Sequence, residues 1–306
     1  MTLTFAVFDH QRKGRALGQA LQDAGHLSVD TPRADVLLID FDAPYAHPRP
    51  QLIEECVEHG GIVLVYPHGA YPTCQYGSSL TADPRVTAQL VQGPGIAEVY
   101  RRLGMTVPVH VVGWYYCPLL PFQPVEKIRR VLFCPAHPSG VGYLCDEMKA
   151  ENARVFETLL AFGAELQVTL LGTPEMNGLW YEPNVVYRAS DLNLQWGDID
   201  QADLVVAEGT KAYLAVARGK PVVMLAQDYA PRGDLDPSPI PGWDELCPMM
   251  KYPLAFDDLD SFFHEQATVA CAGSAEVTEW RARMIGEPWQ PAEFVQLVER
   301  LYEESR

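Results

Sequence analysis

The chain is poor in basic residues and lacks the short motifs of several common enzyme classes. Its 306 residues include 23 lysines and arginines against 40 aspartates and glutamates, so the formal net charge is -17. The average field of such a protein repels polyanions, which disfavours a nucleic-acid acceptor or partner. No G-x-G-x-x-G fingerprint and no Walker loop occurs, which argues against an ordinary nicotinamide dehydrogenase or a P-loop kinase.

Paired cysteines and long apolar runs are missing as well. Seven cysteines are present without a C-x-x-C spacing, so we expect most of them to be reduced, buried and structural, with no zinc site. No apolar run is long enough to span a bilayer, and the opening residues reach charged side chains too soon for a signal-peptide core. We therefore expect a cytoplasmic protein without a membrane span and without a bound metal.

What is present is a regular alternation of β-branched runs and amphipathic helical patterns. This alternation is typical of strand-helix-strand units around a parallel sheet. The first part of the chain has five such expected strands: 5–8, 35–39, 62–66, 88–91 and 109–112. These residues predict a Rossmann-like domain over residues 1–115.

A second alternating series follows a stretch rich in aromatic residues and proline. Residues 113–126 interrupt both periodicities, which predicts a crossing between domains. Strands are then expected at 131–133, 166–171, 184–187, 203–207 and 221–225, with a helix at 210–218. The fold class is thus α/β, with two doubly wound parallel-sheet domains, 1–115 and 126–285, facing a cleft. Residues 229–253 are expected to form a surface loop or lid, and the helix in 286–306 to pack back across the domains.

One segment of the second domain carries the most specific chemical signal. A buried strand ends at Ala207, and Gly209-Thr210 follow at the start of a helix that closes at Gly219-Lys220-Pro221. Free N-H groups and the helix dipole suit a diphosphate at such a position. The pattern resembles the "aD-hydrophobic-SGG…GkP" segment of the UDP-N-acetylglucosamine 2-epimerases and related GT-B glycosyltransferases. That resemblance implies that Gly209 and Thr210 face the phosphates of a nucleotide-sugar donor.

Two departures from that pattern affect the function that it implies. Glu208 stands at the serine position of the family, where its charge would repel a diphosphate unless it were protonated or paired, for instance with Lys211. The acidic pair of the family falls at Tyr213 and Leu214, which argues against 2-epimerase activity. The alternative is a tight strand-helix turn that binds no ligand.

A histidine follows the third strand of the first domain, in Tyr66-Pro-His68-Gly69. The carboxyl ends of parallel strands face the ligand crevice, so His68 is placed where a general base would lie. The segment resembles the histidine-glycine segment of the CDP-glycerol glycerophosphotransferases, which implies that His68 deprotonates an acceptor hydroxyl. Asp9 and His10, after the first strand, are further acid-base candidates, with helix capping by Asp9 as the alternative.

The remaining candidates belong to the donor side. A loop of small residues after the strand 131–133 is expected to complete a phosphate cradle through its backbone N-H groups. Its candidate residues are His137, Ser139, Gly140 and Gly142. The alternative is that the glycines merely permit the turn. Arg188, at the end of the strand 184–187, is a candidate for contact with the nucleotide base.

Together these features predict a metal-independent glycosyltransferase. A UDP- or CDP-linked sugar would be the co-substrate and no further cofactor is expected; a histidine would act as the general base towards a hydroxyl acceptor. A sugar-nucleotide 2-epimerase or a glycerophosphotransferase on the same fold is one alternative. A non-catalytic binding protein with a degenerate GT-B fold is another, and Glu208 is its main support.

Overall fold

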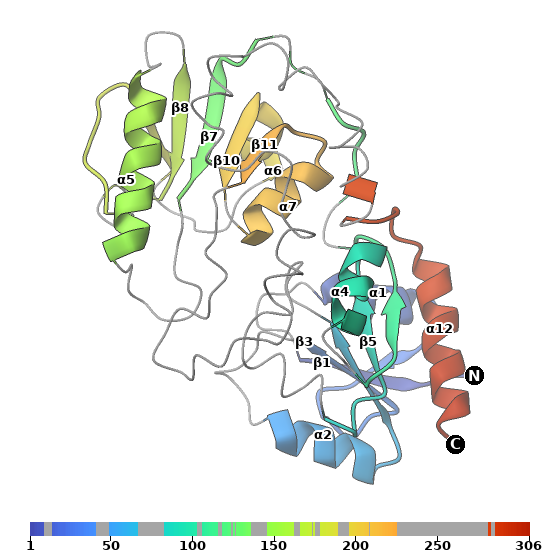
Figure 1. The fold of residues 1–306 in the computed structure, drawn as a ribbon. Coiled ribbons are helices and arrows are strands. Elements are labelled where there is room, and N and C mark those ends of the chain that lie inside the picture. The colour runs from blue at the N-terminus through green and yellow to red at the C-terminus, as the bar shows by residue number, and fades with distance from the viewer. Residues whose placement is uncertain are drawn as a thin grey trace. The chain divides into compact units, whose positions relative to one another are not determined.

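The computed structural model divides the chain into two compact units, each built on a parallel sheet (Figure 1). Within the part of the chain that it describes, unit 1 contains the residues up to 118 and from 282 onward, and unit 2 contains those from 119 to 281. The described residues are 1–8, 14–40, 49–66, 83–102, 106–115, 118–123, 125, 127–135, 146–161, 166–172, 174, 178–188, 196–207, 209–224, 281–282 and 285–306.

The sheet of unit 1 has six parallel strands in the order β2-β1-β3-β4-β5-β6. Their bounds are β1 Thr4–Phe8, β2 Leu27–Ser28, β3 Val36–Asp40, β4 Ile62–Tyr66, β5 Ala88–Val91 and β6 Val109–Val111. All five residues of β4 are buried, as expected for a central strand covered on both faces. The five strands expected from the sequence are confirmed, and β2 is added at one edge.

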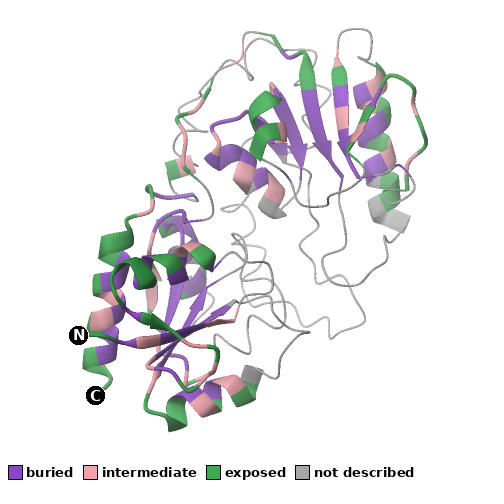
Figure 2. Cartoon of the chain, turned by 180° about the vertical axis from the view of Figure 1, so that it is seen from behind, coloured by how far each residue is buried: buried purple, intermediate pink, exposed green. Residues whose placement is uncertain are grey.

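Helices cover both faces of this sheet. They are α1 Arg15–Asp23, α2 Arg49–Glu58, α4 Pro94–Arg102 and α12 Pro291–Glu304. Leu17 of α1 and Phe294 and Val298 of α12 share one hydrophobic cluster with alternate residues of the strands. Right-handed crossovers place α2 and α4 on the opposite face. Figure 2 shows the central strands largely buried and the outer sides of the helices largely exposed.

A carboxylate at the amino end of β3 ties α12 to the sheet. Asp35 Oδ2 accepts hydrogen bonds from the Thr4 N-H at 2.8 Å and the Thr4 hydroxyl at 2.7 Å. Its Oδ1 accepts one from the Tyr302 hydroxyl, which in turn accepts one from Arg306. Burial alone would raise the pKa of Asp35, but these hydrogen bonds outweigh it and lower that pKa.

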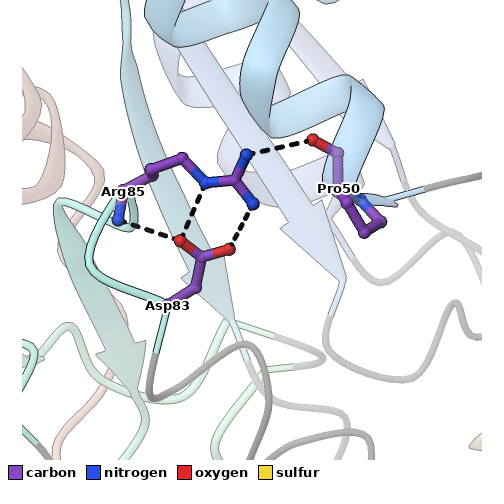
Figure 3. A network of polar contacts seen from close by, with 3 residues as sticks. All are labelled: Pro50, Asp83 and Arg85. Carbon is purple, nitrogen blue, oxygen red and sulfur yellow. Dashed lines mark hydrogen bonds and ion pairs between the residues drawn. The ribbon is translucent and has the colours of Figure 1, made fainter.

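A second ionic contact in unit 1 holds the entry to β5 (Figure 3). The Arg85 guanidinium donates to both carboxylate oxygens of Asp83, at 2.9 and 2.7 Å, and to the Pro50 carbonyl at 3.5 Å. The hydrogen bonds from Arg85 lower the pKa of Asp83. The segment before β5 is thereby joined to the first turn of α2.

The sheet of unit 2 has five parallel strands in the order β11-β10-β7-β8-β9. Their bounds are β7 Arg130–Cys134, β8 Gln167–Leu171, β9 Val186–Arg188, β10 Leu204–Ala207 and β11 Val222–Met224. The helices of this unit are α5 Asp146–Ala161, α6 Trp196–Gln201 and α7 Gly209–Ala217. Phe133 of β7 stacks on Phe156 of α5 with ring centroids 6.4 Å apart, at the centre of the core.

The amino edge of the second sheet repeats the carboxylate contact of the first. Asp203, directly before β10, accepts hydrogen bonds from the backbone N-H groups of Arg129 and Arg130 at 3.0 and 2.9 Å. The Arg130 guanidinium donates to its other oxygen at 2.9 Å. Burial would raise the pKa of Asp203, but these hydrogen bonds outweigh it and lower that pKa.

The structure differs from the sequence prediction in three local features. β2 was not expected, because its two exposed residues show no apolar alternation. The short helix α6 was also missed; Ile199 is its one buried hydrophobic residue. β9 begins two residues later than the pattern of 184–187 indicated and ends on Arg188. In the described part of the chain, no helix is long and apolar enough to cross a membrane.

Candidate functional site

The strand order of unit 2 marks one position on its sheet as the expected ligand crevice. In chain order the five strands lie as 3-2-1-4-5, so the direction of progress reverses between β7 and β10. Ligands of open parallel sheets bind outside the carboxyl ends of the strands at such a reversal. β7 and β10 end together, because Cys134 pairs with Ala207.

α7 begins two residues beyond the end of β10, at this same position. Its first residues are Gly209, Thr210 and Lys211. The first four N-H groups of a helix have no acceptor within it, and the helix dipole adds partial positive charge at that end. Within the described residues, the Lys211 ammonium has no hydrogen bond or ion pair. The reversal point therefore combines helix N-H groups with a cationic side chain.

A second cation lies at the carboxyl end of β9. The Arg188 Nε is 3.2 Å from Asp198 Oδ1, and Asp198 belongs to the first turn of α6. About half of the Arg188 side chain is exposed, whereas that of Asp198 is mostly buried. The ion pair holds the guanidinium in place, and within the described part of the chain it is the one polar interaction of the Arg188 side chain. The sequence suggested Arg188 as a base contact; the structure shows this ion pair.

The buried thiol of Cys134 lies within the electrostatic reach of both helices. Burial raises its pKa to about 12, the charge of Lys211 lowers that pKa, and the charge of Asp198 raises it. Lys211 and Asp198 thus both act on the end of β7. Asp198 and Cys134 were not named from the sequence. An acid at the start of a helix and a cysteine at the end of a strand are too common to be recognised there without the sheet order.

The Gly219-Lys220-Pro221 half of the motif has a packing role. The Gly219 carbonyl accepts a hydrogen bond from the Gln123 N-H at 2.7 Å, and a Cβ built on Gly219 would lie 1.9 Å from the Pro121 carbonyl oxygen. Lys220 is buried and its Nζ donates to the Asp200 carbonyl at 2.8 Å. Burial lowers the pKa of Lys220. This half of the motif therefore fixes residues 120–123 and the end of α6.

The sheet of unit 1 has its reversal between β1 and β3, because its strands lie in the chain order 2-1-3-4-5-6. Asp9 and His10 follow β1 in the chain, and His68 follows β4, which pairs with β3. All three are outside the described residues. Their acid-base roles stay predictions from the sequence.

Structural comparison finds solved structures of similar fold, and glycosyltransferases are among them. The chain aligns with the wall teichoic acid polymerase TagF at a TM-score of 0.52 and 9% identity, over 99% of this chain and 89% of that one. It aligns with the glycosyltransferase SnogD from Streptomyces nogalater at 0.50 and 12%, over 98% and 100%. Acinetobacter baumannii MurG gives 0.50 and 9%, over 97% and 99%. The chain has the GT-B-like fold. No protein-family model and no curated protein sequence matches it.

These likenesses confirm the GT-B-like fold class expected from the sequence. Four of the donor-side candidates lie within the described residues, namely Arg188, Gly209, Thr210 and Lys211, and all four are at the carboxyl edge of the second sheet. The other donor-side candidates lie outside the described residues: His137, Ser139, Gly140, Gly142 and Glu208. In the chain these residues, His137 to Gly142, follow β7, whose carboxyl end lies at the reversal point.

Proposed function

We propose that this protein is a glycosyltransferase that uses a nucleotide sugar as donor, with the donor bound by unit 2. The observation that carries the proposal is the position of the α7 N-terminus, beside the paired ends of β7 and β10 at the reversal of the sheet. Helix N-H groups and the Lys211 ammonium suit a diphosphate there. The GT-B-like fold supports this assignment by analogy of architecture.

The proposed reaction uses a histidine as general base. The base removes the proton of an acceptor hydroxyl, the oxygen attacks the anomeric carbon of the donor, and the bond from that carbon to the diphosphate breaks. The developing charge on the leaving nucleoside diphosphate is stabilised by the N-H groups of Gly209 and Thr210 and by Lys211. His68 is the first candidate for the base. His10 is the second, because it follows β1, one of the two strands at the reversal of the first sheet.

A glycerophosphotransferase is the second candidate function. It is favoured by the His68-Gly69 segment and by the likeness to a wall teichoic acid polymerase, and it would use the same base and the same diphosphate site. The two candidates differ in the donor. Release of CMP from CDP-glycerol would favour the second, whereas release of a nucleoside diphosphate from a nucleotide sugar would favour the first.

Thermal stabilisation by nucleotides tests the donor site. The purified chain is melted with UDP, CDP, GDP, ADP and their sugar conjugates, because a ligand that binds only the native state raises the melting temperature. Gly209→Asp adds a negative charge to the first turn of α7 and should abolish the shift. Gln51→Asp adds the same charge to the first turn of α2 in unit 1, at an exposed residue, and should leave the shift unchanged.

Turnover then tests the general base. His68→Ala should lower the rate of nucleotide release by about a hundredfold or more while nucleotide stabilisation remains, because a general base acts in the transition state. His10→Ala serves as the competing variant. If only His10→Ala loses turnover, the base follows β1; if neither does, the histidine mechanism is wrong.

A further inference from the structure

An exposed group of aromatic side chains lies at the β9 edge of unit 2, and the proposed reaction does not use it. We call Trp180, Tyr181 and Tyr187 the aromatic patch. The Tyr181 side chain is 68% exposed and that of Trp180 is 38% exposed. Trp180 and Tyr181 precede the edge strand β9, and Tyr187 belongs to it. Large exposed aromatic groups on a soluble protein commonly mark a binding surface.

The rings of the patch are held in fixed positions. Tyr181 stacks on Tyr187 with centroids 5.0 Å apart and planes 20° apart. The Tyr187 hydroxyl accepts a hydrogen bond from the Glu182 N-H at 2.6 Å and donates to the Glu182 carbonyl at 3.1 Å. The rings of the aromatic patch are thus ordered before any ligand binds, so binding costs little side-chain entropy.

Trp180 is fixed by the same segment and by the core. Its Nε1 donates to the Glu182 carboxylate at 2.8 Å, and its ring packs edge-on against Phe156 with centroids 5.3 Å apart. Packing against the core therefore explains why Trp180 and Tyr187 are partly buried, since Tyr187 borders the hydrophobic cluster of unit 2. It leaves unexplained why the Tyr181 ring is stacked on Tyr187 while most of its surface faces solvent.

The groups around the rings define the chemistry of the ligand. Glu182 and the exposed Asn184, which follow Tyr181 in the chain, supply hydrogen-bonding groups. Residues 178–187 contain no lysine or arginine, and the cationic side chain against this segment is that of Lys149, which lies at Gly178. Arg188, the next residue, is paired with Asp198. With a net charge of -17 on the whole chain, an anionic ligand such as single-stranded nucleic acid is repelled. A neutral ligand with flat apolar faces and many hydroxyl groups fits both the rings and the polar groups.

We propose that the aromatic patch binds a neutral glycan. The C-H faces of pyranose rings would stack on Tyr181 and on the exposed part of Trp180, and their hydroxyl groups would hydrogen-bond to Glu182 and Asn184. This binding needs no nucleotide and no turnover, so it stands or fails independently of the proposed transferase activity.

Calorimetric titration of the full chain with neutral hexasaccharides tests the proposal. The probes are cellohexaose, maltohexaose and the hexamer of N-acetylglucosamine, with an oligodeoxythymidine as the competing ligand class. At least one hexasaccharide should bind in the millimolar range or tighter without nucleotide. Tyr181→Ala should weaken it by about tenfold, the upper end of what one aromatic contact supplies, whereas Tyr181→Phe keeps the ring and should stay within about twofold.

Leu27→Ala is the matched control, because Leu27 is an exposed apolar side chain of unit 1. It should leave the affinity unchanged, and the melting temperatures of all three variants should stay near that of the parent. The proposal is overturned if no hexasaccharide binds, if Tyr181→Ala binds as tightly as the parent, or if the oligodeoxythymidine binds more tightly than every glycan.

Discussion

Each unit is built on its own parallel sheet, and a comparison of the two sheets at their amino and carboxyl edges separates what is common from what is specific. At the amino edges they are alike: Asp35 and Asp203 each follow an alanine, precede a buried strand and accept hydrogen bonds from the backbone of the neighbouring strand. At the carboxyl edges they differ. Unit 2 presents the α7 N-terminus, Lys211 and the Arg188 ion pair, whereas the candidates of unit 1 lie outside the described residues.

This comparison separates structural motifs from functional ones. The alanine-aspartate-hydrophobic start of the GT-B pattern is found before β3, at Ala34-Asp35-Val36, and before β10, at Ala202-Asp203-Leu204. In both places it holds a strand at the edge of the sheet away from the expected crevice. The Gly219-Lys220-Pro221 part fixes residues 120–123. Only the central Gly209-Thr210 part lies where a ligand is expected. A match to the whole pattern is therefore weaker evidence for function than its length indicates.

We expect the largest effect on stability from substitutions of two glycines that end helices in the same way. Gly219 and Gly60 both have positive φ, and the residue after each donates back into its helix. Gly60→Ala should cost about 1–2 kcal/mol, the strain of a left-handed residue, because its Cβ meets nothing within 4 Å. Gly219→Ala should cost clearly more, because its Cβ meets the Pro121 carbonyl. Urea unfolding of both variants measures the difference, and equal losses would contradict the role given to residues 120–123.

The two aspartates offer the next comparison. Asp203→Asn should lower the free energy of unfolding by about 1–3 kcal/mol, because the Arg130 guanidinium and two N-H groups lose a charged acceptor. Asp35→Asn should cost a similar amount and should also loosen α12, since the Tyr302 hydroxyl loses its charged acceptor. Amide hydrogen exchange of residues 291–304 measures whether α12 is loosened. Faster exchange of α12 in Asp203→Asn but not in Asp35→Asn would contradict this assignment.

The same two carboxylates predict how stability depends on pH. Their pKa values are lowered in the folded state, so the stabilisation they give is present above the unfolded pKa of about 3.9 and is lost as the pH falls through the folded pKa. The difference in unfolding free energy between the parent and Asp203→Asn should be constant near neutral pH and should shrink in acid. A difference that grew as the pH fell would show that folding raises the pKa of Asp203 and does not lower it.

The smallest expected effect concerns one buried cysteine in each unit. Burial raises the pKa of Cys56 and of Cys134 to about 12, so at mildly alkaline pH neither forms the reactive thiolate. Both should resist iodoacetamide in the native protein and react after denaturation, as mapped by mass spectrometry. Native labelling of Cys134 but not Cys56 would show that the end of β7 opens to solvent.

The sequence predicted the long strands of both sheets but was insufficient for the site. β-branched runs and helical periodicity predicted the long strands, α7 and α12, because tertiary packing reinforces those patterns. The pattern missed β2 and α6, which are too short to show a period. It located Gly209 at the start of a helix and Arg188 at the end of a strand. It did not show that Arg188 pairs with Asp198, which follows ten residues later, because that pairing depends on how the strands are ordered in the sheet.

The nucleotide melting experiment with Gly209→Asp and Gln51→Asp tests the central claim most directly. We expect one nucleotide or nucleotide sugar to raise the melting temperatures of the parent and of Gln51→Asp. We expect the same ligand to leave the melting temperature of Gly209→Asp unchanged. A flat panel, or a shift that survives in Gly209→Asp, would contradict a donor site at the N-terminus of α7.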